Sequence, residues 1–404
     1  PASQRAAALV LTAAMLTTLA APAFAKTWYI ENGNITVKAG KIEGTNKVSQ
    51  GETTDEKDTD TVITNRDKDT ASSHTVTINA NGKNDKVEVT LKDVNIEANS
   101  GPALTSKGDV TLTLKGENHL TGGNGGRYGG SGITSNGSLT ITGGENDSLT
   151  AQGGSSADGG SGSYGGDGIG SSSGGVTISG GTVNAAGGSG SYGGNGIYSR
   201  SSLTISGGTV NAAGRDGKDG YGGGGIWSGS GGLTISGGTV TANGGNGGSG
   251  SYGGDGIGSI GGVAISGGTV TANGGNGGNG GDGIGSSSGI DLSGSLELTA
   301  KAGSPSGRVL SQNGDELDLN TIKDKLGPGA KVTTTDANGK VNQVSIPRPV
   351  ESEKPVIPEE SSSSSDGGSA APSAPAFSLP GLTVTDKDGQ RISYTSIRGN
   401  NVLS

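Results

Sequence analysis

The amino-acid sequence predicts an all-β fold, a parallel β-helix in which the chain winds through stacked coils of three short strands. Glycine fills 85 of the 404 positions, and such a composition is typical of disorder unless a period organises it. Here three apolar positions recur in a fixed order, with strand patterning and no helical periodicity. Successive repeats lie 27 to 36 residues apart, as from Ile257 to Ile284 and from Ile133 to Ile169. A strand-based repeat of this length predicts a solenoid.

Three apolar anchors define the repeat. The first anchor is the isoleucine of a Gly-Ile pair, found at Ile133, Ile169, Ile197, Ile226, Ile257 and Ile284. The second follows eight or nine residues later, at Ile141, Ile178, Ile205, Ile235, Ile265 and Leu292. The third comes five to eight residues after the second, at Leu149, Val183, Val210, Val240 and Val270. One more unit is expected upstream, with its anchors at Leu104, Leu112 and Leu120.

Alternation within each short segment predicts which side chains face the core. Val176 and Ile178 are expected to face inward, and Thr177 between them to face solvent. Equivalent residues of coils stacked about 4.8 Å apart then form columns. An alanine column is expected beside the third anchors, at Ala151, Ala185, Ala212, Ala242 and Ala272. Small and large columns side by side predict a narrow, filled core, and the variable glycine stretch becomes a loop at one corner of the coil.

The β-helical domain is expected over residues 26–346, with its regular coils at about 76–300. Before it, residues 1–25 combine a basic start, an apolar run and an Ala-Phe-Ala cleavage site, the pattern of a secretory signal peptide. Because the chain begins at proline rather than methionine, we expect a few residues before it. The charged stretch 52–69 is expected to form a loop, and 310–326 to cap the last coil.

After the domain, residues 347–380 are rich in Pro, Ser and Glu and are expected to form a disordered linker. Residues 381–404 alternate again and predict the start of a further C-terminal β module. Composition also narrows the function. A net charge of −9 and the lack of a basic face argue against nucleic-acid binding. After signal cleavage no segment is long and apolar enough to span a membrane. We therefore expect a secreted or cell-surface protein.

Several early segments carry a family resemblance: residues 87–96 (VEVTLKDVNI), 101–104 (GPAL) and 108–118 (GDVTLTLKGEN). Together with the later Gly-Ile-Gly-Ser and Thr-Ile-Ser-Gly-Gly-Thr-Val units, they resemble the bacterial carbohydrate-binding-domain β-helix family of polygalacturonate-binding type, in its glycine-rich surface-protein branch. The resemblance covers about 26–298. It implies a right-handed parallel β-helix that binds an acidic polysaccharide with calcium and does not cleave it. The partner it implies is a polysaccharide, either a host glycan or a cell-wall glycan.

Tyrosines recur five residues before the first anchors. They are Tyr128, Tyr164, Tyr192, Tyr221 and Tyr252, and Asn279 takes the sixth place. Such a column predicts a ladder of rings inside the glycine loops, on which sugar rings could stack. The alternative is structural, because stacked aromatic rings also brace loops that have nothing else to pack against.

A second aromatic cluster follows two first anchors directly. Tyr198 and Trp227 are expected to point outward on adjacent coils, with Arg200 two residues past the tyrosine. An exposed tyrosine beside an exposed tryptophan is a common surface for carbohydrate, and large exposed apolar patches tend to be functional. The alternative is that a neighbouring loop covers both rings.

An acidic column lies two residues before the first anchors. It contains Asp167, Asn195, Gly224, Asp255 and Asp282. Stacked carboxylates repel unless a cation or donors intervene, so Asp167, Asp255 and Asp282 are candidate calcium ligands. The segment 277–285 also matches the calcium-binding nonapeptide pattern. The alternative is that these residues form turns through their own hydrogen bonds.

Catalysis is the less favoured function. Polysaccharide lyases and hydrolases need clustered acidic and basic side chains on one face. Between Ser131 and Ile290 there are eleven charged residues and no histidine. We therefore expect a non-catalytic, adhesin-like binding protein. A pectate-lyase-like enzyme and a passive structural stalk are the two alternatives, and outward threonine columns leave an ice-binding solenoid as a third.

Overall fold

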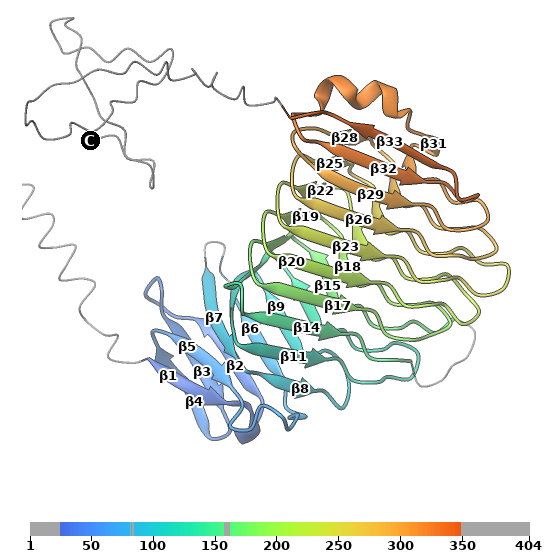
Figure 1. Ribbon diagram of the computed structural model, residues 1–404. Coiled ribbons are helices and arrows are strands. Elements are labelled where there is room, and N and C mark those ends of the chain that lie inside the picture. The colour runs from blue at the N-terminus through green and yellow to red at the C-terminus, as the bar shows by residue number, and fades with distance from the viewer. Residues whose placement is uncertain (1–24, 81, 83–84, 157–161, 349–404) are drawn as a thin grey trace, which may run out of the picture. The chain divides into compact units, whose positions relative to one another are not determined.

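The computed structural model describes residues 25–80, 82, 85–156 and 162–348, and in them the chain is almost entirely β-structure. Three long sheets, here numbered sheets 1, 2 and 3, run along the stack of coils (Figure 1). The parallel β-helix predicted from the repeat is confirmed. The expected signal peptide before Ala25, the linker beyond Arg348 and the C-terminal module lie outside the described residues.

Each regular coil contributes one strand to each of the three sheets. Sheet 1 contains, in order across the sheet, β4 (Thr53–Asp58), β3 (Asn46–Gln50), β2 (Ile35–Ala39), β6 (Val76–Asn79), β9 (Leu104–Lys107), β12 (Ile133–Asn136), β15 (Ile169–Ser173), β18 (Ile197–Ser199), β21 (Ile226–Ser228), β24 (Ile257–Ser259), β27 (Ile284–Ser286), β30 (Leu310–Gln312) and β31 (Asp315–Glu316). Sheet 2 contains β1 (Lys26–Tyr29), β5 (Thr61–Thr64), β7 (Lys86–Lys92), β10 (Asp109–Lys115), β13 (Leu139–Thr142), β16 (Val176–Ile178), β19 (Ser202–Ile205), β22 (Gly232–Ile235), β25 (Val263–Ile265) and β28 (Ile290–Leu292). Sheet 3 contains β8 (Asn95–Glu97), β11 (Glu117–Thr121), β14 (Ser148–Gln152), β17 (Thr182–Ala186), β20 (Thr209–Ala213), β23 (Thr239–Asn243), β26 (Thr269–Asn273), β29 (Glu297–Lys301), β32 (Lys331–Thr335) and β33 (Val341–Ser345). Two short 3-10 helices are η1 (Ile30–Asn32) and η2 (Leu319–Lys325).

The register of the parallel strands confirms the predicted columns. First anchors pair with one another from Ile133 to Ile284 in sheet 1. Second anchors do so from Ile141 in sheet 2, and third anchors from Leu149 in sheet 3. The alanine column pairs beside the third anchors, and all these side chains are buried. Burying each large aliphatic side chain stabilises the fold by about 1.5–3 kcal/mol. Together the columns form one continuous apolar core.

The upstream unit departs from the prediction at one anchor. Leu120 pairs with Ala151 in the alanine column, and Asn118 takes the third-anchor position. Asn118 is fully buried, but its amide is satisfied by backbone groups. Its Oδ1 accepts a hydrogen bond from the Val94 N–H at 3.1 Å, and its Nδ2 donates to the Ser148 carbonyl at 3.0 Å. Because a hydrogen-bonded polar side chain is tolerated in a core, an apolar pattern alone placed this anchor two residues late.

A column of buried serines lies two residues after the first anchors, and the apolar pattern did not indicate it. The column contains Ser106, Ser135, Ser171, Ser199, Ser228, Ser259 and Ser286. Ser199 Oγ donates to the Ser202 carbonyl at 2.9 Å, and Ser228 Oγ donates to the Gly232 carbonyl at 2.6 Å. These carbonyls belong to the first residues of β19 and β22 in sheet 2. The two hydroxyls therefore join the end of a sheet 1 strand to the start of the next sheet 2 strand, whereas those of Ser106 and Ser259 have no hydrogen-bond partner among the described residues.

Antiparallel strands extend sheet 1 at both ends of the stack and sheet 3 at the C-terminal end. At the N-terminal end β3 and β4 extend sheet 1, and at the C-terminal end β33 pairs with β32 in sheet 3. The cap expected over 310–326 is confirmed as β30, β31 and η2. Closed ends matter because the last parallel strands of a solenoid otherwise expose unpaired backbone groups.

The loop expected over 52–69 is wrong for most of that stretch, which contains β4 and β5. Most of its charges remain at the surface and pair across strands, whereas Asp58 is buried and accepts a hydrogen bond from Trp28 Nε1 at 2.7 Å. Asp55 lies 3.1 Å from Lys38, and Glu56 lies 2.8 Å from Lys26. Ile63 meanwhile faces the core. A high density of charge therefore marked the outer face of strands rather than the absence of strands.

The glycine-rich loops leave sheet 3 and return to sheet 1 as two backbone limbs that lie against each other. The N–H of Gly166 donates to the carbonyl of Gly154, Gly188 donates to Gly166, and Gly194 donates to Gly188. Successive bonds alternate: one joins the two limbs of a single coil, and the next joins that coil to the following coil. The chain of bonds runs unbroken from Gly101 to Gly307, and its only member other than glycine is Arg215.

Close approach of the limbs explains why these positions are glycine. A Cβ on Gly166 would overlap the Gly130 carbonyl oxygen. A Cβ on Gly194 would overlap that of Gly166, and one on Gly223 would overlap that of Gly194. Since the obstacle is backbone on both sides, no rotamer change relieves it. The glycine content therefore specifies an ordered, hydrogen-bonded layer that carries the loop side chains in register.

This layer yields the first prediction. Gly223→Ala should destabilise the protein by about 2–3 kcal/mol or more, because its methyl group meets packed backbone. Gly144→Ala is the matched control, since Gly144 is exposed and a Cβ there meets only the Asp147 side chain, at 3.1 Å. Urea unfolding of both variants gives the two free energies. Equal, small effects would show that the limbs are not packed as described.

Candidate functional site

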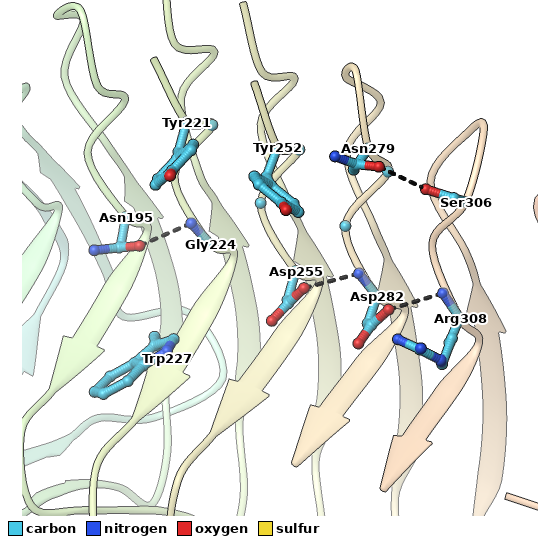
Figure 2. A pocket seen from close by; sticks show the side chains of 15 residues that line it. Asn195, Tyr221, Gly224, Trp227, Tyr252, Asp255, Asn279, Asp282, Ser306 and Arg308 are labelled. Carbon is cyan, nitrogen blue, oxygen red and sulfur yellow. Dashed lines mark hydrogen bonds between the residues drawn. The ribbon is translucent and has the colours of Figure 1, made fainter. Parts of the chain in front are cut away.

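A groove of about 580 Å³ lies between the glycine layer and the start of the sheet 1 strands (Figure 2). One wall carries Trp227 and the carboxylates of Asp255 and Asp282. The opposite wall carries the rings of Tyr221 and Tyr252. Members of all three predicted columns, the tyrosine ladder, the outward aromatic pair and the acidic column, therefore meet at one place.

Trp227 stands on β21 and stacks on Tyr198 of β18, with ring centroids 5.1 Å apart and planes 11° apart. The pair is outward and half-buried, as the alternation predicted. Tyr198 lies on the preceding coil, while on the following coil Gly258 occupies the same column. A Cβ on Gly258 would lie 2.9 Å from Trp227 Cδ1, so only glycine leaves room for the indole. Arg200 is exposed on the bend after β18, and its backbone N–H donates to the Ser171 carbonyl at 2.9 Å.

The tyrosine ladder forms, but its rings do not all present their faces. Tyr128, Tyr164 and Tyr192 stack with centroids 5.5 and 4.7 Å apart and planes within 12°. Each face of Tyr164 is thus covered by a neighbour, and its edge and hydroxyl meet solvent. Tyr221 lies edge-on to both Tyr192 and Tyr252, at interplanar angles of 78° and 82°. The stacking breaks beside the groove, where Tyr221 and Tyr252 remain 52% and 53% exposed.

The acidic column forms a ladder of side-chain to backbone hydrogen bonds (Figure 2). Asp255 Oδ1 accepts from the N–H of Asp282 at 2.8 Å, and Asp282 Oδ1 accepts from the N–H of Arg308 at 2.8 Å. Earlier in the column Asp167 Oδ1 accepts from Asn195, and Asn195 Oδ1 accepts from Gly224. Each side chain therefore fixes the backbone of the next coil. One carboxylate oxygen is committed to structure and the other, Oδ2, is left for the groove.

Burial shifts the ionisation of two members of this column. Desolvation in the groove wall, joined by the negative charge of Asp282, raises the pKa of Asp255 to about 7. Desolvation likewise raises the pKa of Asp167 to about 6, although the N–H and side chain of Asn195 oppose it. Near neutral pH Asp255 is therefore divided between its protonated and ionised forms.

The three candidate calcium ligands do not lie together. Asp255 and Asp282 are on adjacent coils, but Asn195 and Gly224 separate Asp167 from Asp255 along the column. Three coil steps correspond to about 14 Å at the usual strand spacing. In the described part of the chain, no group of three or more His, Cys, Asp or Glu side chains could hold a metal ion. Calcium binding stays a prediction.

Arg308 is the groove residue that the sequence analysis missed. It lines the C-terminal end of the groove, after the last regular coil. A signal was present, because Arg308 precedes Leu310 by two residues and Leu310 pairs with Ile284 in the first-anchor column. It therefore continues the acidic column with a basic side chain. At this coil the first anchor is leucine and no longer follows glycine, so the Gly-Ile pattern does not indicate this member.

Comparison of the chain with known protein families, curated proteins and solved structures found no match in any of the three. Among the described residues no helix is long and apolar enough to cross a membrane.

The raised pKa of Asp255 yields the second prediction. Its carboxyl group binds a proton more tightly folded than unfolded, so between about pH 4 and 7 the parent protein loses stability as the pH rises. Asp255→Asn keeps the Oδ1 acceptor and removes the charge. Its stability relative to the parent should therefore increase across that window, by on the order of 1–3 kcal/mol, because water in the groove screens part of the effect.

Urea unfolding from pH 4 to pH 8 measures this difference. Asp216→Asn serves as the control, because Asp216 is exposed and its Oδ1 also accepts a backbone N–H from the next coil. A stability difference that does not change with pH would mean that the carboxyl group of Asp255 is well solvated.

Proposed function

We propose that this protein is a secreted or cell-surface, non-catalytic binding protein for carbohydrate, and that the glycan occupies the groove beside Trp227. The observation that carries the proposal is the free face of Trp227. Tyr198 covers one face of the indole, and the other looks across Gly258 into a groove lined by carboxylates and tyrosines. A flat apolar ring among hydrogen-bonding groups suits a sugar, which has an apolar face of C–H bonds and a polar rim.

The spacing of the coils supports the same proposal. Adjacent coils lie about 4.8 Å apart, which is close to the advance of one pyranose unit along an extended glycan. A chain running parallel to the stack therefore places about one sugar at each coil. The groove spans coils from Asn195 to Arg308, so it offers contacts to several sugars in succession. The exposed edges of Tyr128 and Tyr164 extend this track toward the N-terminal coils.

The test is a glycan array with the full chain, followed by titration of each ligand that binds. Trp227→Ala should weaken binding at least about tenfold, the loss expected for one stacking ring. Because Trp227 points outward from β21, the melting temperature of the Trp227→Ala variant should stay near that of the parent. Tyr29→Ala, on β1 at the N-terminal end of sheet 2 and away from the groove, is the aromatic control. Undiminished binding by Trp227→Ala would exclude the groove as the site.

Glycoside hydrolysis is the second candidate, and the Asp255 and Asp282 pair favours it. Glycosidases pair a carboxyl group of raised pKa with an ionised carboxylate. Incubation with pectin and neutral glycans, with assays for new reducing ends and for unsaturated products, separates the two candidates. Turnover that Asp282→Asn abolishes would replace binding with catalysis.

A further inference from the structure

The two carboxylates of the groove converge on a single small space. Asp255 and Asp282 each use Oδ1 to accept a backbone N–H. Their Oδ2 atoms both approach the same point, because a Cβ built on Gly285 would lie 3.2 Å from Oδ2 of Asp255 and 3.3 Å from Oδ2 of Asp282. Gly285 is buried, and the lack of a side chain there lets both carboxylate oxygens lie close together beside its backbone.

Aromatic rings border that space. A Cβ on Gly258 would lie 2.9 Å from Cδ1 of Trp227 and 3.0 Å from Oδ2 of Asp255, so the indole and this carboxylate meet over the adjacent coil. On the opposite wall Tyr252 directs its ring toward the groove (Figure 2). The space is therefore bordered by two carboxylate oxygens and by the aromatic rings of Trp227 and Tyr252.

This combination selects for positive charge. Carboxylates attract a cation directly, and the face of an indole ring attracts it through its quadrupole. Arg308 follows Asp282 in the same column (Figure 2), and within the described residues its guanidinium forms no ion pair with Asp255 or Asp282. Both carboxylates therefore remain available to a ligand. A uronic acid would instead bring a third carboxylate into the same space.

Building on the proposed function, we infer that the groove recognises a glycan with free primary amines, a hexosamine whose ammonium lies between Asp255, Asp282 and Trp227. An ammonium offers three N–H donors, enough for both Oδ2 atoms and one further acceptor. N-acetylation removes its charge and leaves a single N–H, too few donors for both Oδ2 atoms. The proton held by Asp255 leaves when the ammonium enters, because a nearby cation favours the ionised carboxylate.

Isothermal titration of the full chain with three tetrasaccharides tests this inference. The ligands are a glucosamine tetramer, its fully N-acetylated counterpart and a galacturonate tetramer, each at about 0.15 M salt to screen long-range attraction. The glucosamine tetramer should bind at least about tenfold more tightly than the acetylated one, and the galacturonate tetramer more weakly than either. Asp255→Asn/Asp282→Asn should remove the preference for the free amine.

A charge-matched control separates the site from the acidity of the whole protein. Asp216→Asn/Asp219→Asn changes the net charge equally on an exposed loop and should leave the preference intact. Gly285→Ala tests the space itself, because its methyl group would lie against both Oδ2 atoms and should also weaken amine binding at least about tenfold.

The outcomes distinguish this inference from the proposed function. Equal binding of the free and acetylated tetramers, lost in Trp227→Ala, would retain glycan binding and overturn the amine preference. A tetralysine peptide that binds as tightly as the glucosamine tetramer, and as tightly to Trp227→Ala as to the parent, would also overturn the amine preference. Positive charge alone would then explain the binding. Binding of no glycan in the array or the titration would refute both.

Discussion

The hydrogen-bonded layer of glycine limbs is the constraint on which the groove depends. The coil core fixes only the sheets, and the loops at the corner between sheets 3 and 1 vary in length from one coil to the next. In isolation such loops would have large conformational entropy. Here each limb hydrogen-bonds the limb beside it, from Gly101 to Gly307, so loops of different length share one backbone register. The tyrosines stay in a column because the glycines beneath them do.

Two separate parts of the structure therefore position the two walls of the groove. The first anchors fix the strands of sheet 1 and with them Trp227 and the acidic column, while the glycine layer fixes Tyr221 and Tyr252. Asp255 and Asp282 join one coil to the next, because each Oδ1 accepts an N–H from the following coil. Half of each carboxylate therefore has a structural role that explains its position without any ligand. The other half faces the groove at the energetic cost that appears as the raised pKa of Asp255.

The sequence alone was sufficient to predict the strands of the coil, but not to predict the contacts between loops. Apolar side chains recur at fixed spacing in Ile133, Ile141 and their equivalents, and burial of such columns has few geometric solutions. The burial of Asn118 was not predicted because its hydrogen bonds to backbone groups replace apolar packing. The strands over 52–69 were not predicted because their outer faces are charged. The tyrosine column was visible, but its change from stacked to edge-on rings depends on packing that spacing does not encode. The convergence of Asp255 and Asp282 over Gly285 likewise required three-dimensional placement.

The groove lies where the repeat is broken, and that coincidence bears on function. Where neighbouring coils carry Tyr198 and Trp227, the next two carry Gly258 and Gly285. In the tyrosine column Asn279 replaces the ring, and in the acidic column Gly224 interrupts the ladder. A solenoid selected for stability alone would favour uniform columns, because each like pair adds stacking or hydrogen bonding between coils. In the outward column Gly170 also precedes Tyr198, so the aromatic pair is itself a departure, and it lies on nearly the same coils as Gly224 and Asn279. Departures that cluster in space while they are scattered in sequence are expected of a binding site carried on a repetitive frame.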